Sequence, residues 1–205
     1  MLEFLIWIGT ITFAATGALV AVGKRFDIIG TLVLASVTAV GGGAIRDVIV
    51  GSLPPASFTD EPLLWAVTLT GLVTFYLHRF IRAEGKFLYA LDTLGLAIFA
   101  ALGAERGLSF GLGLWGTVFA GAVSGVGGGV LRDLLSGQVP GILYRSGDFY
   151  ASAAAFGAAT VFFLHSTNPD LALVAGVLVA LILRVGGRAL GFNLPVPSSS
   201  NESSP

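Results

Sequence analysis

The sequence predicts an all-α integral membrane protein with seven transmembrane helices, arranged as two inverted three-helix repeats and a seventh helix. Three observations predict this fold: an apolar composition, seven apolar segments separated by charged or Pro- and Gly-rich stretches, and an internal repeat. Of 205 residues, 55% are hydrophobic and 11% are charged, whereas a typical soluble domain has about 25% charged residues. The mean hydropathy of +0.88 is tolerated where lipid replaces water as the solvent.

The apolar segments are separated by charged residues or by clusters of Pro and Gly. The first run follows Met1-Leu2-Glu3, which lacks the basic region and cleavage site of a secretory signal, so we predict a retained helix. A helix spans the bilayer core with about 20 residues, and tilting or thinning accommodates the shorter segments four, six and seven. In order, the predicted spans are Phe4–Val22, Ile28–Val50, Pro62–Phe80, Phe87–Leu102, Leu108–Leu135, Phe149–Leu164 and Leu171–Val185.

An internal repeat appears when the chain is aligned with itself at an offset of 86 residues. Residues Thr31–Pro54 and Thr117–Pro140 then share 10 identities in 24 positions, including Gly-Gly-Gly-x-x-Arg-Asp and the Gly and Pro that follow it. We therefore predict a first repeat over 1–86, a second over 87–168, a seventh helix over 169–190 and a flexible tail over 191–205. Because each repeat has an odd number of spans, the second repeat enters the membrane from the opposite face, as in many transporters.

The connecting segments carry their positive charges mainly on one side of the membrane. Eight Lys and Arg residues fall on one side and Arg106 alone on the other. The positive-inside rule then predicts a multi-pass protein of the cell membrane with its N-terminus outside and its C-terminus in the cytoplasm. The eight residues are Lys24, Arg25, Arg79, Arg82, Lys86, Arg145, Arg184 and Arg188.

Two glycine triplets lie inside the second and fifth spans. Glycine costs about 1 kcal/mol relative to Ala inside a helix, so we expect a break or kink at each triplet. Backbone groups freed by a break cannot face lipid, and this predicts that the triplets line a cavity or pore. The triplets are Gly41, Gly42, Gly43 and Gly127, Gly128, Gly129.

An Arg-Asp pair follows each triplet, as Arg46-Asp47 and Arg132-Asp133. Ionised side chains inside a span are costly unless they are paired or hydrated, so we expect a role in the pathway as pore or gating charges. Adjacent helical residues point in different directions, and we therefore expect each Arg and Asp to find partners other than each other. The alternative is that each Asp caps a half-helix and each Arg reaches the headgroups.

Other polar residues within the predicted spans carry weaker signals. Thr38 and Ser124 occupy matched positions, three residues before the triplets, and with Thr16 they are candidate pore-lining residues. Isolated Ser and Thr in spans more often bond to their own backbone or to a neighbouring helix. Asp92 is a candidate pore charge, although an interfacial carboxylate is the commoner case.

Several function classes find no support in the sequence. The absence of cysteine excludes disulfides and thiolate sites, and no metal-ligand spacing appears in the sequence. There is no Walker A motif and no nucleophile with a base, so we predict neither an enzyme nor a cofactor. The net charge of −1 gives no indication of nucleic-acid binding.

The paired Gly-Gly-Gly-x-x-Arg-Asp-x-x-x-Gly motifs in a seven-span chain resemble the prokaryotic branch of the trimeric intracellular cation (TRIC) channels. The resemblance covers about residues 4–188. It implies a homotrimer in lipid, with one pore per protomer between the repeats, lined by spans one, two, four and five. It also implies kinks at both triplets and permeant monovalent cations, potassium foremost. The Lys-Glu-Val signature of animal members is absent.

Three functions remain open at this point. A passive cation channel keeps a continuous wet path, and this is the function that the resemblance favours. In a secondary transporter of glycine or a similar small zwitterion, the path is never open to both sides of the membrane at once. A membrane scaffold would use the glycines only for helix packing.

Overall fold

The computed structural model describes residues 1–79, 85–143 and 149–191, and these form an all-helical protein. Of the predicted features, Arg82, Arg145 and nearly all of the tail lie outside the described residues. The long helices are α1 (Leu2–Gly23), α2 (Ile28–Val50), α4 (Glu61–Leu77), α5 (Gly85–Ser109), α6 (Leu114–Leu135), α7 (Tyr150–Leu164) and α8 (Pro169–Leu190). A short helix, α3 (Ala56–Thr59), and a 3₁₀ turn, η1 (Gly141–Leu143), follow α2 and α6.

Five of the described helices are long and apolar enough to cross a membrane. These are α1, α2, α5, α6 and α8, each of 22 to 25 residues. The apolar helices α4 and α7 are shorter, with 17 and 15 residues. The count of seven spans therefore remains a prediction, while a multi-span helical architecture is what the structure has.

Two helices extend several residues beyond their predicted C-terminal ends. The predicted fourth span stops at Leu102, but α5 continues to Ser109 because Glu105 contacts His165 and Arg106 reaches Asp47. Leu108 consequently belongs to α5 and not to the fifth span. The predicted seventh span stops at Val185, whereas α8 runs to Leu190.

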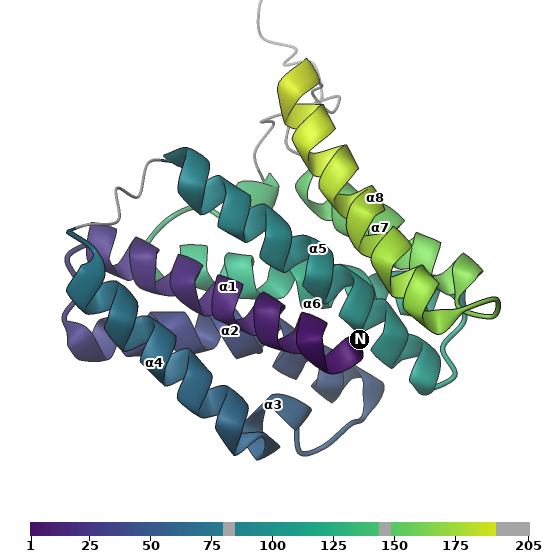
Figure 1. Ribbon diagram of the computed structural model, residues 1–205, viewed down its shortest axis with the longest axis horizontal. Helices are drawn as coiled ribbons and strands as arrows, with labels where there is room; N and C mark the ends of the chain where they lie inside the picture. The colour runs from purple at the N-terminus through teal and green to yellow at the C-terminus, as the bar shows by residue number, and fades with distance from the viewer. Residues whose placement is uncertain (80–84, 144–148, 192–205) are drawn as a thin grey trace, which may run out of the picture.

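The helices form a layered bundle in which α1, α2, α5 and α6 are central (Figure 1). Helix α4 packs on one flank against α1 and α2, and α7 packs on the other against α5 and α6. Helix α8 lies outermost on the second side, in contact with α5 and α7. The central four helices are the matched pairs of the 86-residue offset, α1 with α5 and α2 with α6.

The two repeats adopt the same backbone at matched positions. The residues that precede α2 and α6, Asp27 and Gly113, both have φ −70° and ψ −179°. After each helix a left-handed glycine follows, Gly51 with φ 78° and Gly137 with φ 71°. The next amide donates to the matched aspartate carbonyl at 2.8 Å in both copies. The internal repeat is therefore a repeat of structure as well as of sequence.

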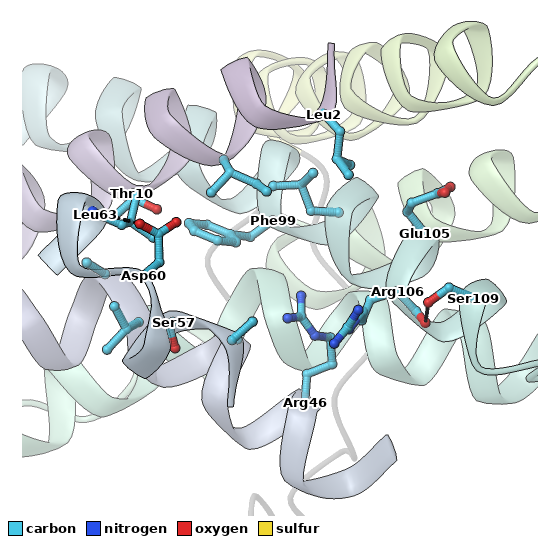
Figure 2. Close-up of a pocket in the computed structure, with 16 residues that line it drawn as sticks. Leu2, Thr10, Arg46, Ser57, Asp60, Leu63, Phe99, Glu105, Arg106 and Ser109 are labelled. Atoms are coloured by element: carbon cyan, nitrogen blue, oxygen red, sulfur yellow. Dashed lines mark hydrogen bonds between the residues drawn. The ribbon is translucent and has the colours of Figure 1, made fainter. Parts of the chain in front are cut away.

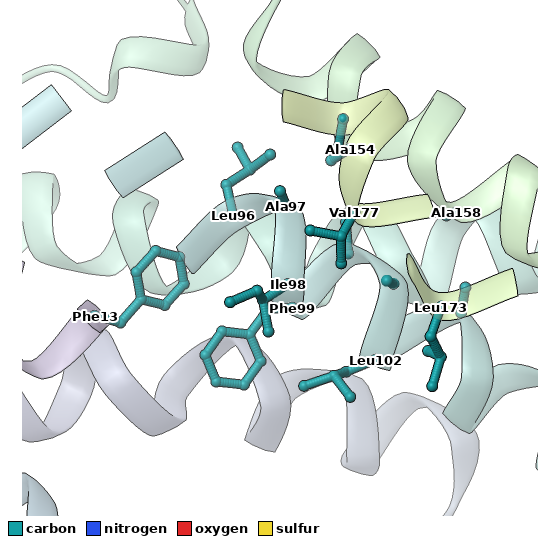
Figure 3. Close-up of a cluster of buried hydrophobic side chains, with 14 of the residues drawn as sticks. Phe13, Leu96, Ala97, Ile98, Phe99, Leu102, Ala154, Ala158, Leu173 and Val177 are labelled. Atoms are coloured by element: carbon teal, nitrogen blue, oxygen red, sulfur yellow. The ribbon is translucent and has the colours of Figure 1, made fainter. Parts of the chain in front are cut away.

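Helices α1 and α5 pack through a reciprocal contact at the centre of the bundle. Phe13 and Phe99 occupy matched positions, and their rings stack with centroids 5.3 Å apart. Each ring lies against the matched glycine of the other helix, Phe99 against Gly9 and Phe13 against Gly95. Figure 3 shows both rings at the edge of an apolar core that continues through small side chains toward α7 and α8.

Helices α2 and α6 cross at the glycine triplets through a second reciprocal contact. A Cβ on Gly42 would lie 2.5 Å from the Ser124 carbonyl oxygen, and one on Gly128 would collide with the Thr38 carbonyl oxygen. Because both contacts pair a triplet glycine with the residue four positions earlier in the other triplet's helix, the two helices run antiparallel. Both helices are continuous through their triplets. A break is therefore absent, and a kink remains a prediction.

Candidate functional site

A cavity of about 290 Å³ opens at the end of the bundle where α2 and α5 finish, which we call the cavity end. Helices α1 to α5 all contribute to its wall, so both repeats enclose it. Thr10 and the cationic pair Arg46 and Arg106 supply polar groups, while Ile6, Val40 and Phe99 are among the apolar residues. Figure 2 shows the two arginines together on one wall.

A cluster of two arginines and one aspartate forms the charged part of this wall. Arg46 donates from Nε and Nη2 to Asp47 Oδ1 at 3.0 and 2.8 Å, and Arg106 Nε lies 3.7 Å from the same oxygen. The Asp47 side chain is only 1% exposed, and its Oδ2 accepts from the Ala56 amide at 3.0 Å. Asp47 therefore fixes both guanidinium groups and also ties α3 to the end of α2.

Two further carboxylates line the cavity on other walls and have partners of their own. Asp60 accepts from the Leu63 amide at 3.1 Å and so caps α4. Glu105 lies 2.9 Å from His165 Nδ1. Among the described residues, Asp47 is thus the carboxylate that pairs with Arg46 and Arg106.

The opposite end of the bundle, which we call the network end, is held by a buried ion network. Asp92 bridges two arginines: Oδ1 accepts from Arg132 Nη1 and Oδ2 from Arg184 Nη2, both at 2.6 Å. Arg132 also donates from Nε to Asp133 Oδ1 at 3.0 Å. Two guanidinium groups thus face two carboxylates, and all four residues are buried. This charge balance offsets much of the cost of burying ions.

Tyrosine rings cover the network. The Arg184 guanidinium lies 4.2 Å from the centroid of the Tyr150 ring, and Arg188 lies 3.9 Å from that of Tyr89. The Tyr150 hydroxyl occupies the space that a Cβ on Gly129 would take. The matched glycine, Gly43, instead lines the cavity. The two ends of the central helices therefore differ, with space at one end and a packed network at the other.

The predicted pore-lining residues divide into a few that meet the cavity and many that pack helices. Gly43 and Arg46 line the cavity. The hydroxyls of Thr16 and Thr38 bond to carbonyls of their own helices at 2.8 and 2.6 Å, and Ser124 accepts from Arg46 at 3.3 Å. The remaining triplet glycines, Gly41, Gly42, Gly127, Gly128 and Gly129, face neighbouring helices in close contact.

We predicted that the adjacent Arg and Asp residues would not pair with each other, and this prediction is wrong. Each guanidinium group folds back onto the carboxylate of the next residue, in Arg46-Asp47 and in Arg132-Asp133. The long arginine side chain spans the angle that separates the two Cβ atoms. The expected crossed partners occur as well, since Arg132 also bonds to Asp92. Asp92 is buried, and it pairs with Arg132 on α6 and Arg184 on α8.

Three residues at the two ends were not predicted from the sequence as site residues: Arg184, Arg106 and Tyr150. Arg184 was assigned to a connecting segment although it falls inside the last apolar run, and a charge at that position was the available signal. Arg106 was treated as a lone loop charge, yet it lies on the wall of the cavity. No sequence signal distinguishes Tyr150.

Comparison with known proteins gives a consistent set of matches. A family model described as glycine transporter matches residues 3–79 and 89–166. A UPF0126 membrane protein of Deinococcus radiodurans is 46% identical over 197 residues, which cover 95% of this chain and 91% of that protein. The UPF0126 inner membrane protein YadS of Escherichia coli is 35% identical, with 93% and 92% covered.

Solved structures match over nearly the whole chain. One, described as giving the structural basis for conductance through TRIC cation channels, has a TM-score of 0.87 and 37% identity and covers 97% of this chain and 98% of its own. The TRIC trimeric intracellular cation channel orthologue from Rhodobacter sphaeroides has a TM-score of 0.87 and 38% identity, with 93% and 98% covered.

Proposed function

Because this chain belongs to the prokaryotic TRIC family, we propose that it is a potassium-preferring channel for monovalent cations. The observation that carries the proposal is the match at TM-score 0.87 and 37% identity to a structure of a TRIC cation channel. Each protomer of a homotrimer would hold its own pore between the two repeats. The cavity supports that position, since Ile6 and Arg46 from the first repeat and Phe99 and Arg106 from the second all line it.

The proposed path enters at the cavity and is closed at the network end. Water and a cation fit a cavity of about 290 Å³, whereas the described residues around Asp92 are buried and packed. Conduction therefore requires Arg132 and its partners to move aside. The pore and gating charges in this proposal are Arg46, Asp47, Asp92, Arg132 and Asp133.

The proposed orientation places the chain as a multi-pass protein of the cell membrane with inverted repeats. The antiparallel crossing of α2 and α6 supports the inversion, because matched helices of inverted repeats run in opposite directions. Lys24, Arg79 and Arg188 all lie at the network end, which the positive-inside rule assigns to the cytoplasm. The cavity would then open to the outside.

Recording from the purified protein in planar bilayers tests the channel. In a gradient of KCl we expect unitary currents that reverse near the potassium equilibrium potential. In Arg106→Gln we expect a potassium conductance roughly two- to five-fold higher, since removing a positive charge from the cavity wall lowers the barrier for a cation by about 1 kcal/mol. The Arg106 side chain is 37% exposed and so tolerates the change.

The matched control is Arg79→Gln, which removes the same charge from an exposed position at the network end, outside both the cavity and the ion network. Its conductance should stay close to that of the unaltered protein. Currents that reverse near the chloride potential, or an equal rise in both variants, would contradict the proposal.

A second candidate is a secondary transporter of glycine or a similar small zwitterion. The matching family model carries that description, and the cavity wall bears both charge signs, with Arg46 and Arg106 opposed by Asp60 and Glu105. This function predicts saturable uptake of labelled glycine into proteoliposomes in the absence of unitary currents. Uptake with currents absent would favour it over the channel.

A further inference from the structure

One carboxylate bridging two guanidinium groups is the central feature of the network end. Asp92 gives one oxygen to Arg132 and the other to Arg184, each at 2.6 Å. Asp92 lies on α5, the helix that the 86-residue offset matches to α1. This arrangement has a counterpart at the cavity end.

The counterpart lacks its bridging carboxylate. The residue matched to Arg132 is Arg46, and the residue matched to Asp92 is Ile6, both of which line the cavity. A second guanidinium is nevertheless present, because Arg106 reaches the same wall from the end of α5. The cavity thus lies where the matched network has an aspartate side chain.

The charge count of the two arginine clusters differs in the same sense, while Asp60 and Glu105 on other cavity walls have partners of their own. At the network end Arg132 and Arg184 meet Asp92 and Asp133, whereas at the cavity end Arg46 and Arg106 share Asp47. Arg46 Nη1, the atom matched to the one that bonds Asp92, has only a 3.3 Å contact with the Ser124 hydroxyl. One guanidinium therefore remains without a carboxylate of its own within this cluster.

We propose that the cavity binds the carboxylate of a small monocarboxylic acid between Arg46 and Arg106, in the place that Asp92 takes at the other end. The carboxylate suits two guanidinium groups because its two oxygens can each accept from one of them. Apolar residues such as Val40 and Phe99 cover the rest of the ligand. Acetate, which is the side chain of aspartate as a free molecule, is the minimal probe.

The test is equilibrium binding of radiolabelled acetate to the purified protein in detergent. We expect saturable binding by the unaltered protein, and binding at least ten-fold weaker in Ile6→Asp, whose own carboxylate would occupy the site. In Arg106→Gln we expect a similar loss, because one of the two guanidinium groups is removed. Ile6→Val, which keeps an apolar residue at that position, should bind acetate as before.

Three results would overturn the proposal. They are no saturable binding by the unaltered protein, full binding in both Ile6→Asp and Arg106→Gln, and displacement by chloride as effective as displacement by unlabelled acetate. Should Ile6→Asp fail to fold, Arg106→Gln decides the matter, since that side chain is partly exposed. The measurement needs no transport, so loss of binding and loss of current are separate outcomes.

Discussion

Asp92→Ala is expected to destabilise the protein more than any other single change of charge. The substitution leaves Arg132 buried with Asp133 alone and takes from Arg184, also buried, the carboxylate that it pairs with. Removing one partner of a buried ion pair costs roughly 3–5 kcal/mol, and here two partners lose their bond. We expect thermal unfolding in detergent to shift down by roughly 10 °C, as followed by size-exclusion chromatography of heated samples.

Two further variants establish the cause. Asp170→Asn removes an exposed carboxylate at the start of α8 and should leave the unfolding temperature unchanged. Asp92→Leu combined with Arg184→Leu removes one charge of each sign and should recover most of the stability, because a packed apolar pair can replace a buried ion pair. An unfolding temperature for Asp92→Ala within 2 °C of the unaltered protein, which is roughly the shift for 1 kcal/mol, would show that the network is not stabilising.

Gly42→Ala and Gly128→Ala should be almost as damaging, and by similar amounts. A Cβ at position 42 would lie 2.5 Å from the backbone carbonyl oxygen of Ser124, and one at position 128 would meet the matched carbonyl of Thr38. No side chain can rotate to relieve either clash, so α2 and α6 must separate. Overpacking of this kind costs about 1–3 kcal/mol, measurable as a lower unfolding temperature.

The control for both is Gly186→Ala, because a Cβ there has nothing within 4 Å. Alanine is favoured over glycine in a helix by up to about 1 kcal/mol, so this variant should be neutral or slightly stabilised. If Gly42→Ala behaved like Gly186→Ala, the close crossing of the two helices would be wrong. If only one of the two triplet variants were destabilised, the reciprocal contact would be wrong.

The repeat was the part of the fold that the sequence predicted best. Ten identities at one offset mark the matched segments that pack at the centre of the bundle. A duplicated segment repeats its contacts as well as its amino-acid sequence. The stacked pair of Phe13 and Phe99 falls at that offset, and so do the crossing glycines Gly42 and Gly128. The family resemblance followed from the same motifs.

The charged site was predicted less well because the repeat does not single out its partners. Arg184 lies on α8, outside the repeat, and pairs with Asp92. Tyr150 on α7 lies inside the second repeat and covers Arg184, but the residue matched to it at the 86-residue offset is Leu64. The glycine triplets were read as breaks because glycine is a poor helix former. Tight helix crossing, which requires the same residue, keeps both helices continuous.

Helix α8 has no matched helix in the first repeat. Its Arg184 pairs with Asp92 at the network end only, whereas the central helices are related in matched pairs. In the proposed channel, the path is open at the cavity end and closed by the ion network at the other end, so it is asymmetric along its length. The current should therefore rectify, with unequal size at equal and opposite voltages. Arg184→Leu should make the relation between current and voltage more symmetrical, because it removes the charge that α8 contributes to the network end alone.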